Sequence, residues 1–555
     1  MNRKRFWLIN SLIWGVGLLA FSVYADSPQN GSINGPTDFN PGKFERRTKN
    51  WVGDDSAKGI KWVVPLGNTT YNQAVLSDHF VMIATNNGNA YLEKYPERVD
   101  LGCLLAFDRK TGAFCWQYSA EKLQNTDHDW PLQGLCSKPV VDNKEQNVWF
   151  VNNRSEVVCL SIDQRSVVDS EPKIVWTFDM MKEIGSLPHQ MTCCNPLIVD
   201  HFLLTGTSNG VAMNDKDIPA PKSPNCIALD KKTGKLIWSD LDQFCDQIPD
   251  SKLLDGQWAS PILIPSNNNV PFNQIVYPCG DGWIYVYRID NQSIVPFWKF
   301  DANPKTSFWK GNGQGTRNII MSTPVYSEEQ SLLFLTTGQD PEAGEGEAVF
   351  WAIDVKKAVD LAVHTREETA SGENKASGKS LDVSETLVVD SQNNPVESQR
   401  YLACDSSLSQ KEIPNPNSAV CWKYQGLNPV SDDFEDIFHR TLGTPAIVNH
   451  MIFIGDFSGL IHCLDAQTGK CYWVYDSMAT IWASPMSVGN IVYLGNTDGD
   501  LYLFNAETTE MNLIETVNMG APIYAAPTWD ALNQTLFIPT NRYLFAIDSE
   551  KETRE

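Results

Sequence analysis

Short runs of mainly hydrophobic residues follow one another along most of the chain, separated by turns rich in Gly, Asn and Asp. The runs are rich in β-branched and aromatic residues, which is typical of antiparallel strands. The three-to-four-residue spacing of amphipathic helices is nearly absent. The pattern therefore predicts an all-β protein.

One stretch of this pattern returns along the chain. Residues 455–473 read GDFSGLIHCLDAQTGKCYW, in which a strand ends in Leu-Asp, a Thr-Gly turn follows, and a Trp comes after it. The same offsets occur in AFDRKTGAFCW at 106–116 and in ALDKKTGKLIW at 228–238. A unit of four short strands cannot bury its own face, so the units are expected to stack on one another.

Each repeat opens with a short segment that ends in Pro, which is tolerated at the first residue of a strand because it has no N–H to donate. Seven such openings and a degenerate one near 71–75 give eight units. Their expected bounds are 71–120, 134–181, 191–241, 257–301, 319–425, 441–478, 481–519 and 521–548.

The two ends of the chain complement each other. The last unit stops after three strands, while IKWVV at 60–64 looks like the outer strand of a unit without its other three. Pairing these pieces removes an exposed sheet edge and closes a ring. The sequence therefore predicts an eight-bladed β-propeller of four-stranded antiparallel blades, closed by an N-terminal strand.

Composition narrows the class of partner. The chain has 555 residues, of which 42% are hydrophobic, and this is ample for one large repeat domain. Its formal charge of −23 argues against a nucleic-acid or anionic-membrane partner, because few basic groups are available to displace counterions from phosphates.

The N-terminus has the features of an export signal. Arg3, Lys4 and Arg5 precede an apolar core at 6–21 and small residues at 23–25, which predicts a signal peptide over 1–25. An uncleaved anchor is the alternative. No other run reaches the roughly 18 apolar residues of a membrane-spanning helix. We therefore expect an exported, soluble protein, periplasmic or extracellular, with no transmembrane segment after signal cleavage.

The remaining boundaries follow from composition. Residues 26–50 are rich in Asn, Gly, Pro and Ser and are expected to form a flexible lead-in. The propeller is expected over 51–548, with a tail at 549–555. The 13 cysteines are an odd number, and some are expected to pair in an oxidising compartment, although the sequence assigns no partners.

The repeated Asp, Thr-Gly and Trp positions, together with GDGW at 280–283 and TDGD at 497–500, resemble the pyrroloquinoline-quinone-like (PQQ-like) β-propeller repeat. The resemblance covers about 51–548 and implies an eight-bladed ring. Members include periplasmic quinoprotein dehydrogenases and noncatalytic propellers of the outer-membrane protein assembly machinery. The resemblance also implies that the repeated tryptophans dock neighbouring blades; these are Trp116, Trp176, Trp238, Trp298, Trp422 and Trp473.

The resemblance raises PQQ and calcium as candidate cofactors, but two dehydrogenase features are absent from the sequence. There is no Arg-Pro-Gly-Asp-Asn motif, which alcohol dehydrogenases of the family carry near the quinone, and no Cys-x-x-Cys-His haem motif. Adjacent Cys193 and Cys194 point the other way, because some family dehydrogenases carry a vicinal disulfide. Such a bridge would be strained, since adjacent Cα atoms lie about 3.8 Å apart. The alternative is that the two residues point to opposite sides of a strand.

Propeller geometry indicates one face as the candidate site. We call it the funnel face, and it carries the loops that enter each innermost strand and the loops that join the second strand to the third. The candidate ligand-binding residues in the entering loops are His189, Trp258, Arg317, Arg440, Trp482 and Tyr524. Paired guanidiniums with Trp faces suit an anionic or aromatic ligand, a quinone carboxylate included. The alternative is that Arg317 and Arg440 hold the acidic loop described next.

A second-to-third loop, GQDPEAGEGE at 338–347, gathers four carboxylates, which are hard oxygen ligands of the kind that calcium takes. These candidates are Asp340, Glu342, Glu345 and Glu347. They lack the fixed spacing of an EF-hand, so a solvated acidic loop is the alternative.

One segment interrupts the repeats. In the fifth unit, about 356–418 replaces the usual short turn and is rich in Ser, Glu, Lys and Asn. Its polarity favours a mobile loop, and its position in the repeat predicts the face opposite the candidate site.

Three functional hypotheses remain. The first is an exported binding or scaffold propeller that holds a protein segment or a small molecule at its funnel face. The second is a PQQ-dependent oxidoreductase of the periplasm. The third is another enzyme on the same ring, for which no nucleophile and base stand out. Fold alone does not decide among them, because propellers carry unrelated functions.

Overall fold

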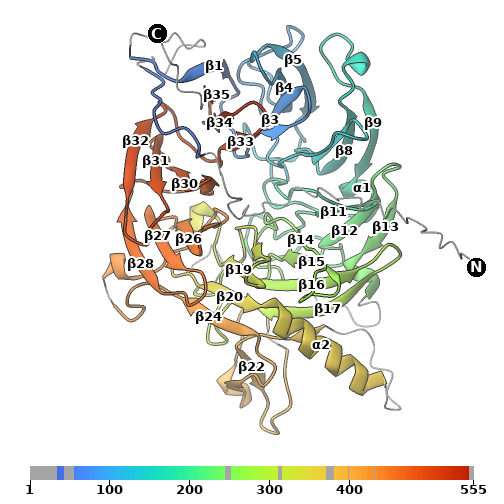
Figure 1. The fold of residues 1–555 in the computed structure, drawn as a ribbon. Coiled ribbons are helices and arrows are strands. Elements are labelled where there is room, and N and C mark those ends of the chain that lie inside the picture. The colour runs from blue at the N-terminus through green and yellow to red at the C-terminus, as the bar shows by residue number, and fades with distance from the viewer. Residues whose placement is uncertain are drawn as a thin grey trace, which may run out of the picture.

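Eight β-sheets stand side by side in a ring in the computed structural model of the protein (Figure 1). The structure describes residues 34–42, 56–243, 252–310, 315–370, 380–397, 399–431 and 433–548. The predicted signal peptide, the C-terminal tail and Trp51 lie outside these residues. Each sheet contains four antiparallel strands in sequence order, apart from the closing blade and one added strand. The predicted eight-bladed propeller is confirmed.

The first four blades follow the chain from the innermost strand outward. Their strands are β2 (Val75–Leu76), β3 (Phe80–Asn86), β4 (Leu101–Asp108) and β5 (Phe114–Glu121); β6 (Val140–Asp142), β7 (Asn147–Val151), β8 (Glu156–Ser161) and β9 (Ile174–Asp179); β10 (Leu197–Val199), β11 (Phe202–Gly206), β12 (Cys226–Asp230) and β13 (Leu236–Ser239); and β14 (Ile262–Ile264), β15 (Asn273–Pro278), β16 (Trp283–Ile289) and β17 (Ile294–Asp301).

The next three blades have the same order. Their strands are β18 (Val325–Ser327), β19 (Leu332–Thr336), β20 (Phe350–Asp354) and β24 (Val420–Tyr424); β25 (Ala446–Val448), β26 (Met451–Gly455), β27 (Leu460–Asp465) and β28 (Cys471–Asp476); and β29 (Met486–Val488), β30 (Ile491–Gly495), β31 (Asp500–Asn505) and β32 (Leu513–Asn518).

The eighth blade is built from both ends of the chain, as predicted. It joins β33 (Thr528–Asp530), β34 (Thr535–Pro539) and β35 (Tyr543–Asp548) to the N-terminal β1 (Ile60–Pro65). Strands β1 and β35 pair antiparallel, with Trp62 opposite Ala546. The ring therefore closes by hydrogen bonding between the two ends of the described chain, which leaves no unpaired edge at the seam.

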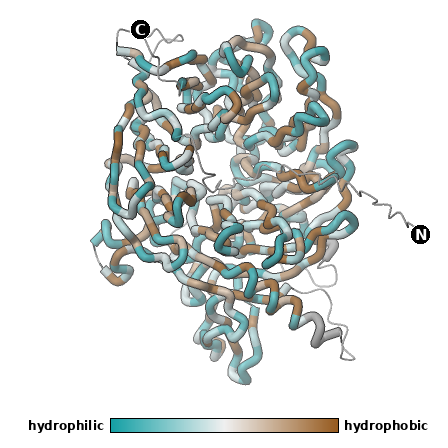
Figure 2. Tube along the Cα trace, in the orientation of Figure 1, coloured by the Kyte–Doolittle hydropathy of each residue, from teal (hydrophilic) through white to brown (hydrophobic). Residues whose placement is uncertain are grey.

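Helices are few and short apart from one. They are α1 (Met180–Ile184), α2 (Val355–Ala370) and the 3-10 turns Gln164–Ser166, Asp240–Gln243, Pro341–Ala343, Ser406–Leu408 and Phe434–Asp436. In the described part of the chain, none is long and apolar enough to cross a membrane. Apolar residues lie mainly in the strands and polar residues mainly in the connecting loops (Figure 2).

The Thr-Gly turn and the Trp of the repeat form one docking contact between neighbouring blades. Gly469 has φ of +70°, and a Cβ there would lie 2.4 Å from the Trp422 ring of the preceding blade. The Trp422 indole N–H donates to the Ala466 carbonyl at 3.2 Å. Equivalent indole-to-carbonyl bonds join Trp62 to the first blade and Trp176 to the third. Trp176 and Trp422 therefore have the predicted docking role, Trp62 has it without having been predicted, and the Trp298 indole N–H donates within its own blade, to Gln274 Oε1 at 2.8 Å.

The small polar residues that precede the repeated Pro at the blade openings link neighbouring blades. The Asn195 N–H donates to Ser260 Oγ of the next blade, and the Thr444 N–H donates to Ser484 Oγ, both at 2.9 Å. Small polar side chains therefore link the innermost strands of neighbouring blades, at a point where Pro contributes no donor of its own.

The insertion differs from the prediction of a mobile loop on the opposite face. Helix α2 buries Val359 and Ala362 in the apolar core of blades 4 and 5. Strand β21 (Leu381–Asp382) then joins the outer edge of blade 4, parallel to β17, and β22 (Thr386–Val389) pairs with β23 (Lys411–Pro414). The described part of the insertion thus packs on the ring, because a narrow apolar stripe runs through an otherwise polar segment.

The insertion also reaches the funnel face. The Trp309 N–H, in the loop that enters blade 5, donates to the Tyr401 carbonyl at 2.8 Å. Arg400 Nε donates to the Leu253 carbonyl, in the loop that enters blade 4, at 2.6 Å. The described part of the insertion therefore runs along the outer edge of blade 4, from the face opposite the candidate site to the funnel face.

Part of the predicted flexible lead-in is likewise packed. The Phe39 side chain is buried in the core of blades 6 to 8, and the Pro36 carbonyl accepts from Tyr493 Oη at 2.8 Å. Burial of one aromatic ring outweighs the turn-forming composition around it over residues 34–42.

Candidate functional site

Four aromatic side chains gather on the funnel face across the seam of the ring. Tyr71 enters blade 1, Trp482 enters blade 7, Tyr524 enters blade 8, and Phe457 lies in the turn between β26 and β27. The Tyr71 and Trp482 rings stack with centroids 5.9 Å apart and planes 10° apart. Trp482 lies 5.0 Å from Tyr524 and 6.2 Å from Phe457. All four are partly exposed, and we call them the aromatic patch.

The Tyr71 hydroxyl of the aromatic patch is held by a hydrogen bond within the protein. Tyr71 Oη donates to Gln133 Oε1 at 2.6 Å. Burial raises the pKa of the Tyr71 phenol above its ordinary value, and the nearby Cys136 and Cys193 thiols act in the same direction. Tyr71 therefore contributes a neutral ring with one satisfied hydroxyl.

The structure places His189 and Trp258 on the other side of the funnel face. His189 Nε2 lies 3.2 Å from Asp255 Oδ1, and His189 Nδ1 lies 2.8 Å from the Val211 carbonyl. Burial lowers the pKa of His189 and raises the pKa of Asp255 well above its usual range, so it favours the uncharged form of each. The Trp258 ring centroid is 6.0 Å from that of His189. This group is buried and hydrogen-bonded within the protein.

Arg317 points into the protein and not toward the face. Only 2% of its side chain is exposed, and its Nη2 donates to Asp301 Oδ1 at 3.0 Å. Lys305 Nζ donates to the same carboxylate at 2.6 Å. Burial opposes ionisation of Asp301, but the charges of Arg317 and Lys305 outweigh it and hold the pKa of this carboxyl below its usual value.

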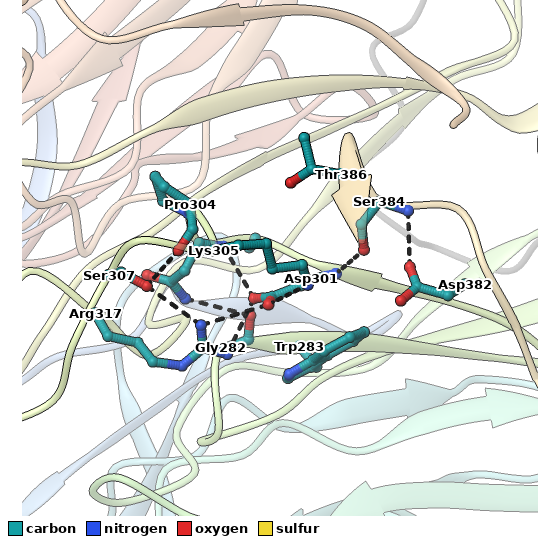
Figure 3. Close-up of polar contacts among 12 residues, drawn as sticks. Gly282, Trp283, Asp301, Pro304, Lys305, Ser307, Arg317, Asp382, Ser384 and Thr386 are labelled. Atoms are coloured by element: carbon teal, nitrogen blue, oxygen red, sulfur yellow. Dashed lines mark hydrogen bonds and ion pairs between the residues drawn. The ribbon is translucent and has the colours of Figure 1, made fainter. Parts of the chain in front are cut away.

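The insertion completes this ion cluster, which comprises Asp301, Lys305 and Arg317 (Figure 3). The Asp301 N–H donates to Ser384 Oγ at 2.8 Å, and Ser384 lies just after β21. Lys305 Nζ also lies 4.5 Å from the centre of the Trp283 ring. The cluster therefore fastens blade 4, the loop entering blade 5 and the insertion to one another.

Arg440 holds the acidic loop through backbone carbonyls. Its Nη1 donates to the Ala343 carbonyl at 3.1 Å and its Nε to Asn318 Oδ1 at 2.9 Å. The residue is 4% exposed. Of the two roles that the sequence left open for the arginines, loop holding has direct contacts for Arg440, while Arg317 pairs with Asp301. Ligand binding by either residue stays a prediction.

The carboxylates of the acidic loop have separate surroundings. Asp340 caps the 3-10 turn Pro341–Ala343 by accepting from the Glu342 N–H, and Glu347 bridges to His439 through the backbone. Burial raises the pKa of Asp340 to about 6, and the charges of Glu342 and Asp215 add to the rise. Among the described residues, no three His, Cys, Asp or Glu side chains gather closely enough to hold a metal ion. This finding includes Asp340, Glu342, Glu345 and Glu347.

Cys193 and Cys194 are free thiols that face different neighbours, so the vicinal disulfide is not present in the structure. Cys194 Sγ accepts from the Gly206 N–H at 3.0 Å and donates to the Ala259 carbonyl at 3.3 Å. Interaction with the Cys136 thiol, at the entrance of blade 2, and burial raise the pKa of Cys193 well above its usual range. The two side chains have different neighbours, as the alternative interpretation expected, but residues 193 and 194 lie in the loop before β10 and not in a strand.

These contacts do not fit a PQQ–calcium group. A quinone with several carboxylates needs cations that face it, and calcium needs converging oxygen ligands. Arg317 is instead committed to Asp301, and Arg440 binds protein carbonyls and Asn318. The four loop carboxylates do not converge.

Sequence reasoning missed Tyr71, Phe457 and Cys136 as members of the funnel face. Tyr71 sits in the degenerate opening of the first unit, and Phe457 lies inside the repeat itself in GDFSG. Tyr71 could have been found by aligning the openings of all eight blades, because it occupies the position that Trp482 and Tyr524 have in theirs.

Comparisons with known proteins agree with this architecture. A family model described as outer membrane protein assembly factor BamB matches residues 61–240 and 414–512, about half of the chain. The crystal structure of BamB from Moraxella catarrhalis aligns with a TM-score of 0.51 and 11% identity, over 88% of this chain and 99% of that chain.

Two further structures were also found. Quinohemoprotein alcohol dehydrogenase from Comamonas testosteroni aligns with a TM-score of 0.42 and 12% identity, over 90% of this chain and 77% of that chain. Sqt1 from Saccharomyces cerevisiae aligns with a TM-score of 0.49 and 8% identity, over 89% and 99% of the two chains. No curated protein sequence matches significantly. With half of its length matched by the family model, the chain belongs to the PQQ-like β-propeller family of the outer membrane protein assembly factor BamB.

Proposed function

We propose that this protein is an exported, noncatalytic propeller that binds a polypeptide segment at its funnel face, as a binding or scaffold module. The observation that carries the proposal is the aromatic patch, whose four rings are partly exposed and contact one another across blades 6, 7, 8 and 1. Rigid aromatic groups supply large contact area at low entropic cost and are enriched at protein interfaces.

The rest of the funnel face supports the same proposal. The charged groups that a cofactor would need are engaged within the protein, as Arg317 with Asp301 illustrates. Burial raises the pKa of Asp340 and of Asp255, and the charges of Glu342 and Asp215 add to both rises. A positively charged group would relieve this repulsion, so this side of the face suits one. A polypeptide segment with apolar residues and a Lys or Arg matches both parts of the face, the aromatic patch and the carboxylates near Asp340.

Binding is tested with an array of short peptides that combine apolar and basic residues. Wild-type protein is expected to bind a subset of them, and Trp482→Ala with Tyr524→Ala is expected to weaken binding at least about tenfold, as loss of a central aromatic contact does. Tyr472→Ala, on the outer strand β28 at the opposite end of the blade, is the matched control and is expected to bind like wild type.

Two results contradict the proposal. Binding that survives the double substitution places the partner elsewhere on the molecule. Tight uptake of PQQ with calcium, together with dye reduction by alcohols, supports the oxidoreductase hypothesis instead.

Export is tested separately by fractionating cells that produce the full chain, and retention in the cytosol contradicts that part of the proposal.

A further inference from the structure

Cys136 and Cys193 occupy equivalent positions in neighbouring blades. Each lies two residues before the polar residue that precedes Pro, which is Lys138 in blade 2 and Asn195 in blade 3. The Lys138 N–H donates to Asn195 Oδ1 at 2.6 Å, so the two segments run side by side at this point. Innermost strands converge on the axis of a propeller, so equivalent residues of adjacent blades approach most closely there.

The two thiols are also close enough to influence each other. Interaction with the Cys136 thiol, together with burial, raises the pKa of Cys193 well above its usual range. Cys136 is 3% exposed, while Cys193 is partly exposed and packs against the apolar cluster that contains Trp258. Cys193 is therefore the more accessible residue of the pair.

The thiol of neighbouring Cys194 has different surroundings from that of Cys193. Its thiol is buried and is held by the Gly206 N–H and the Ala259 carbonyl. A bridge from Cys193 to Cys194 would also be strained, since neighbouring Cα atoms are closer together than the usual disulfide range. Cys136 and Cys193 have no such restriction, because they lie in the loops that enter two different blades.

We propose that Cys136 and Cys193 form a reversible disulfide that fastens blade 2 to blade 3 on the funnel face. The oxidant is a small-molecule disulfide or a dithiol–disulfide oxidoreductase. The Cys193 thiolate attacks one sulfur of the oxidant disulfide and forms a mixed disulfide, and the first thiol of the oxidant leaves. The Cys136 thiolate then attacks Cys193 Sγ and releases the second thiol, so two protein protons and two electrons end on the oxidant.

The bridge stands beside the aromatic patch, because both sulfurs lie close to the Tyr71 hydroxyl. It closes the whole of blade 2 into one loop and stabilises the fold by restricting the unfolded chain. In an exported protein the bridge is expected to be formed, and under cytosolic conditions it is expected to be open. The inference does not depend on which ligand the funnel face binds.

The experiment treats the full chain with oxidised glutathione and maps its tryptic peptides by mass spectrometry. Wild type is expected to give a cross-linked pair of peptides, one with Cys136 and one with Cys193, lighter by two hydrogens than the separate peptides. No Lys or Arg separates Cys193 from Cys194, so the matched variant Cys194→Ser decides between them. It is expected to keep the cross-link, while Cys193→Ser and Cys136→Ser lose it.

A second measurement compares the thermal midpoints of oxidised and reduced wild type. The oxidised form is expected to melt a few degrees higher, and the difference disappears in Cys193→Ser. Exposed Cys421 reports that the oxidant is active by forming a mixed disulfide with glutathione. Unlinked Cys136 in a sample where Cys421 is modified overturns the proposal, as does a cross-link that persists in Cys193→Ser. If a variant fails to fold, fragmentation of the wild-type cross-linked peptide between residues 193 and 194 assigns the bridge instead.

Discussion

The aromatic patch and the ion cluster both lie at the funnel face, yet they use their side chains in opposite ways. In the ion cluster, Asp301 is buried, its carboxylate accepts hydrogen bonds from Lys305 and Arg317, and its N–H donates to Ser384 Oγ. In the patch, Trp482 and its three partners are only partly buried and mostly touch one another. Side chains that are fully satisfied inside the protein contribute to stability, whereas partly exposed rings on a shared face are available to a partner.

The insertion contributes to the ion cluster, so its deletion tests the stabilising role of that region and is expected to have the largest effect. We expect replacement of residues 356–418 by a short Thr-Gly turn to lower the free energy of unfolding by roughly 3–6 kcal/mol, since burial of Val359 and of Val383 contributes about 1.5–3 kcal/mol each. Denaturant unfolding measures the change. Val359→Asp is expected to mimic it, while Lys356→Ala, on the exposed side of α2, is the control.

The mobile loop that the sequence alone predicts would instead give an almost unchanged melting temperature on deletion. A surface loop adds little closure entropy, about 0.6 kcal/mol for each doubling of its length. The argument applies only to a segment that does not pack, and the buried face of α2 removes that condition. A deletion variant that unfolds like wild type would show that these contacts contribute nothing.

Breaking the ion cluster is expected to have the next largest effect. Asp301→Ala leaves Arg317 and Lys305 buried without their carboxylate, and loss of one member of a buried ion pair typically destabilises by roughly 3–5 kcal/mol. Thermal and denaturant midpoints measure it. Asp360→Ala, which removes the exposed partner of Lys356, is expected to leave both midpoints nearly unchanged. Equal effects of the two substitutions would contradict the assignment.

The patch is expected to behave in the opposite way. Trp482→Ala removes aromatic contacts worth about 0.5–1.5 kcal/mol each, so the melting temperature is expected to fall only slightly while peptide binding is lost. Arg317→Ala is expected to show the reverse, with lower stability and unchanged peptide affinity in the protein that remains folded. Loss of peptide affinity in Arg317→Ala at unchanged stability would move Arg317 from the stabilising cluster to the binding surface.

The smallest expected effect concerns the acidic loop that lies between the two regions. The pKa of Asp340 is about 6 in the folded protein against an ordinary value of 3.8, so the folded state binds more protons between these pH values. Stability is therefore expected to fall as pH rises from about 4 to 6, by on the order of 1 kcal/mol. Thermal midpoints across this range measure it. Asp340→Asn is expected to flatten the slope, and an unchanged slope would assign the pH dependence to other groups.

Much of the ring was predictable because its information is local and repeated. The Asp, Thr-Gly and Trp offsets predict both the strands and their docking, since the Gly of one blade lies under the Trp of the preceding blade. The matching deficits at 60–64 and 521–548 predict the closure, because an unpaired edge in each piece has only the other as its partner. Two of the four patch residues, Trp482 and Tyr524, follow from the same counting.

Other features depended on contacts between distant segments. Arg317 looks like a ligand group in sequence, and only the approach of Asp301 and Ser384 shows that it is buried. The apolar stripe of α2 is short and sits in polar surroundings, so its burial becomes evident only against blades 4 and 5. Cys136 acquires meaning only beside Cys193, 57 positions later in the chain. The sequence by itself therefore determined the strands, the repeat and the closed ring, through local patterning. The tertiary structure alone decided which funnel-face side chains are buried and which stay exposed, because burial depends on neighbours that the ring brings together from different blades.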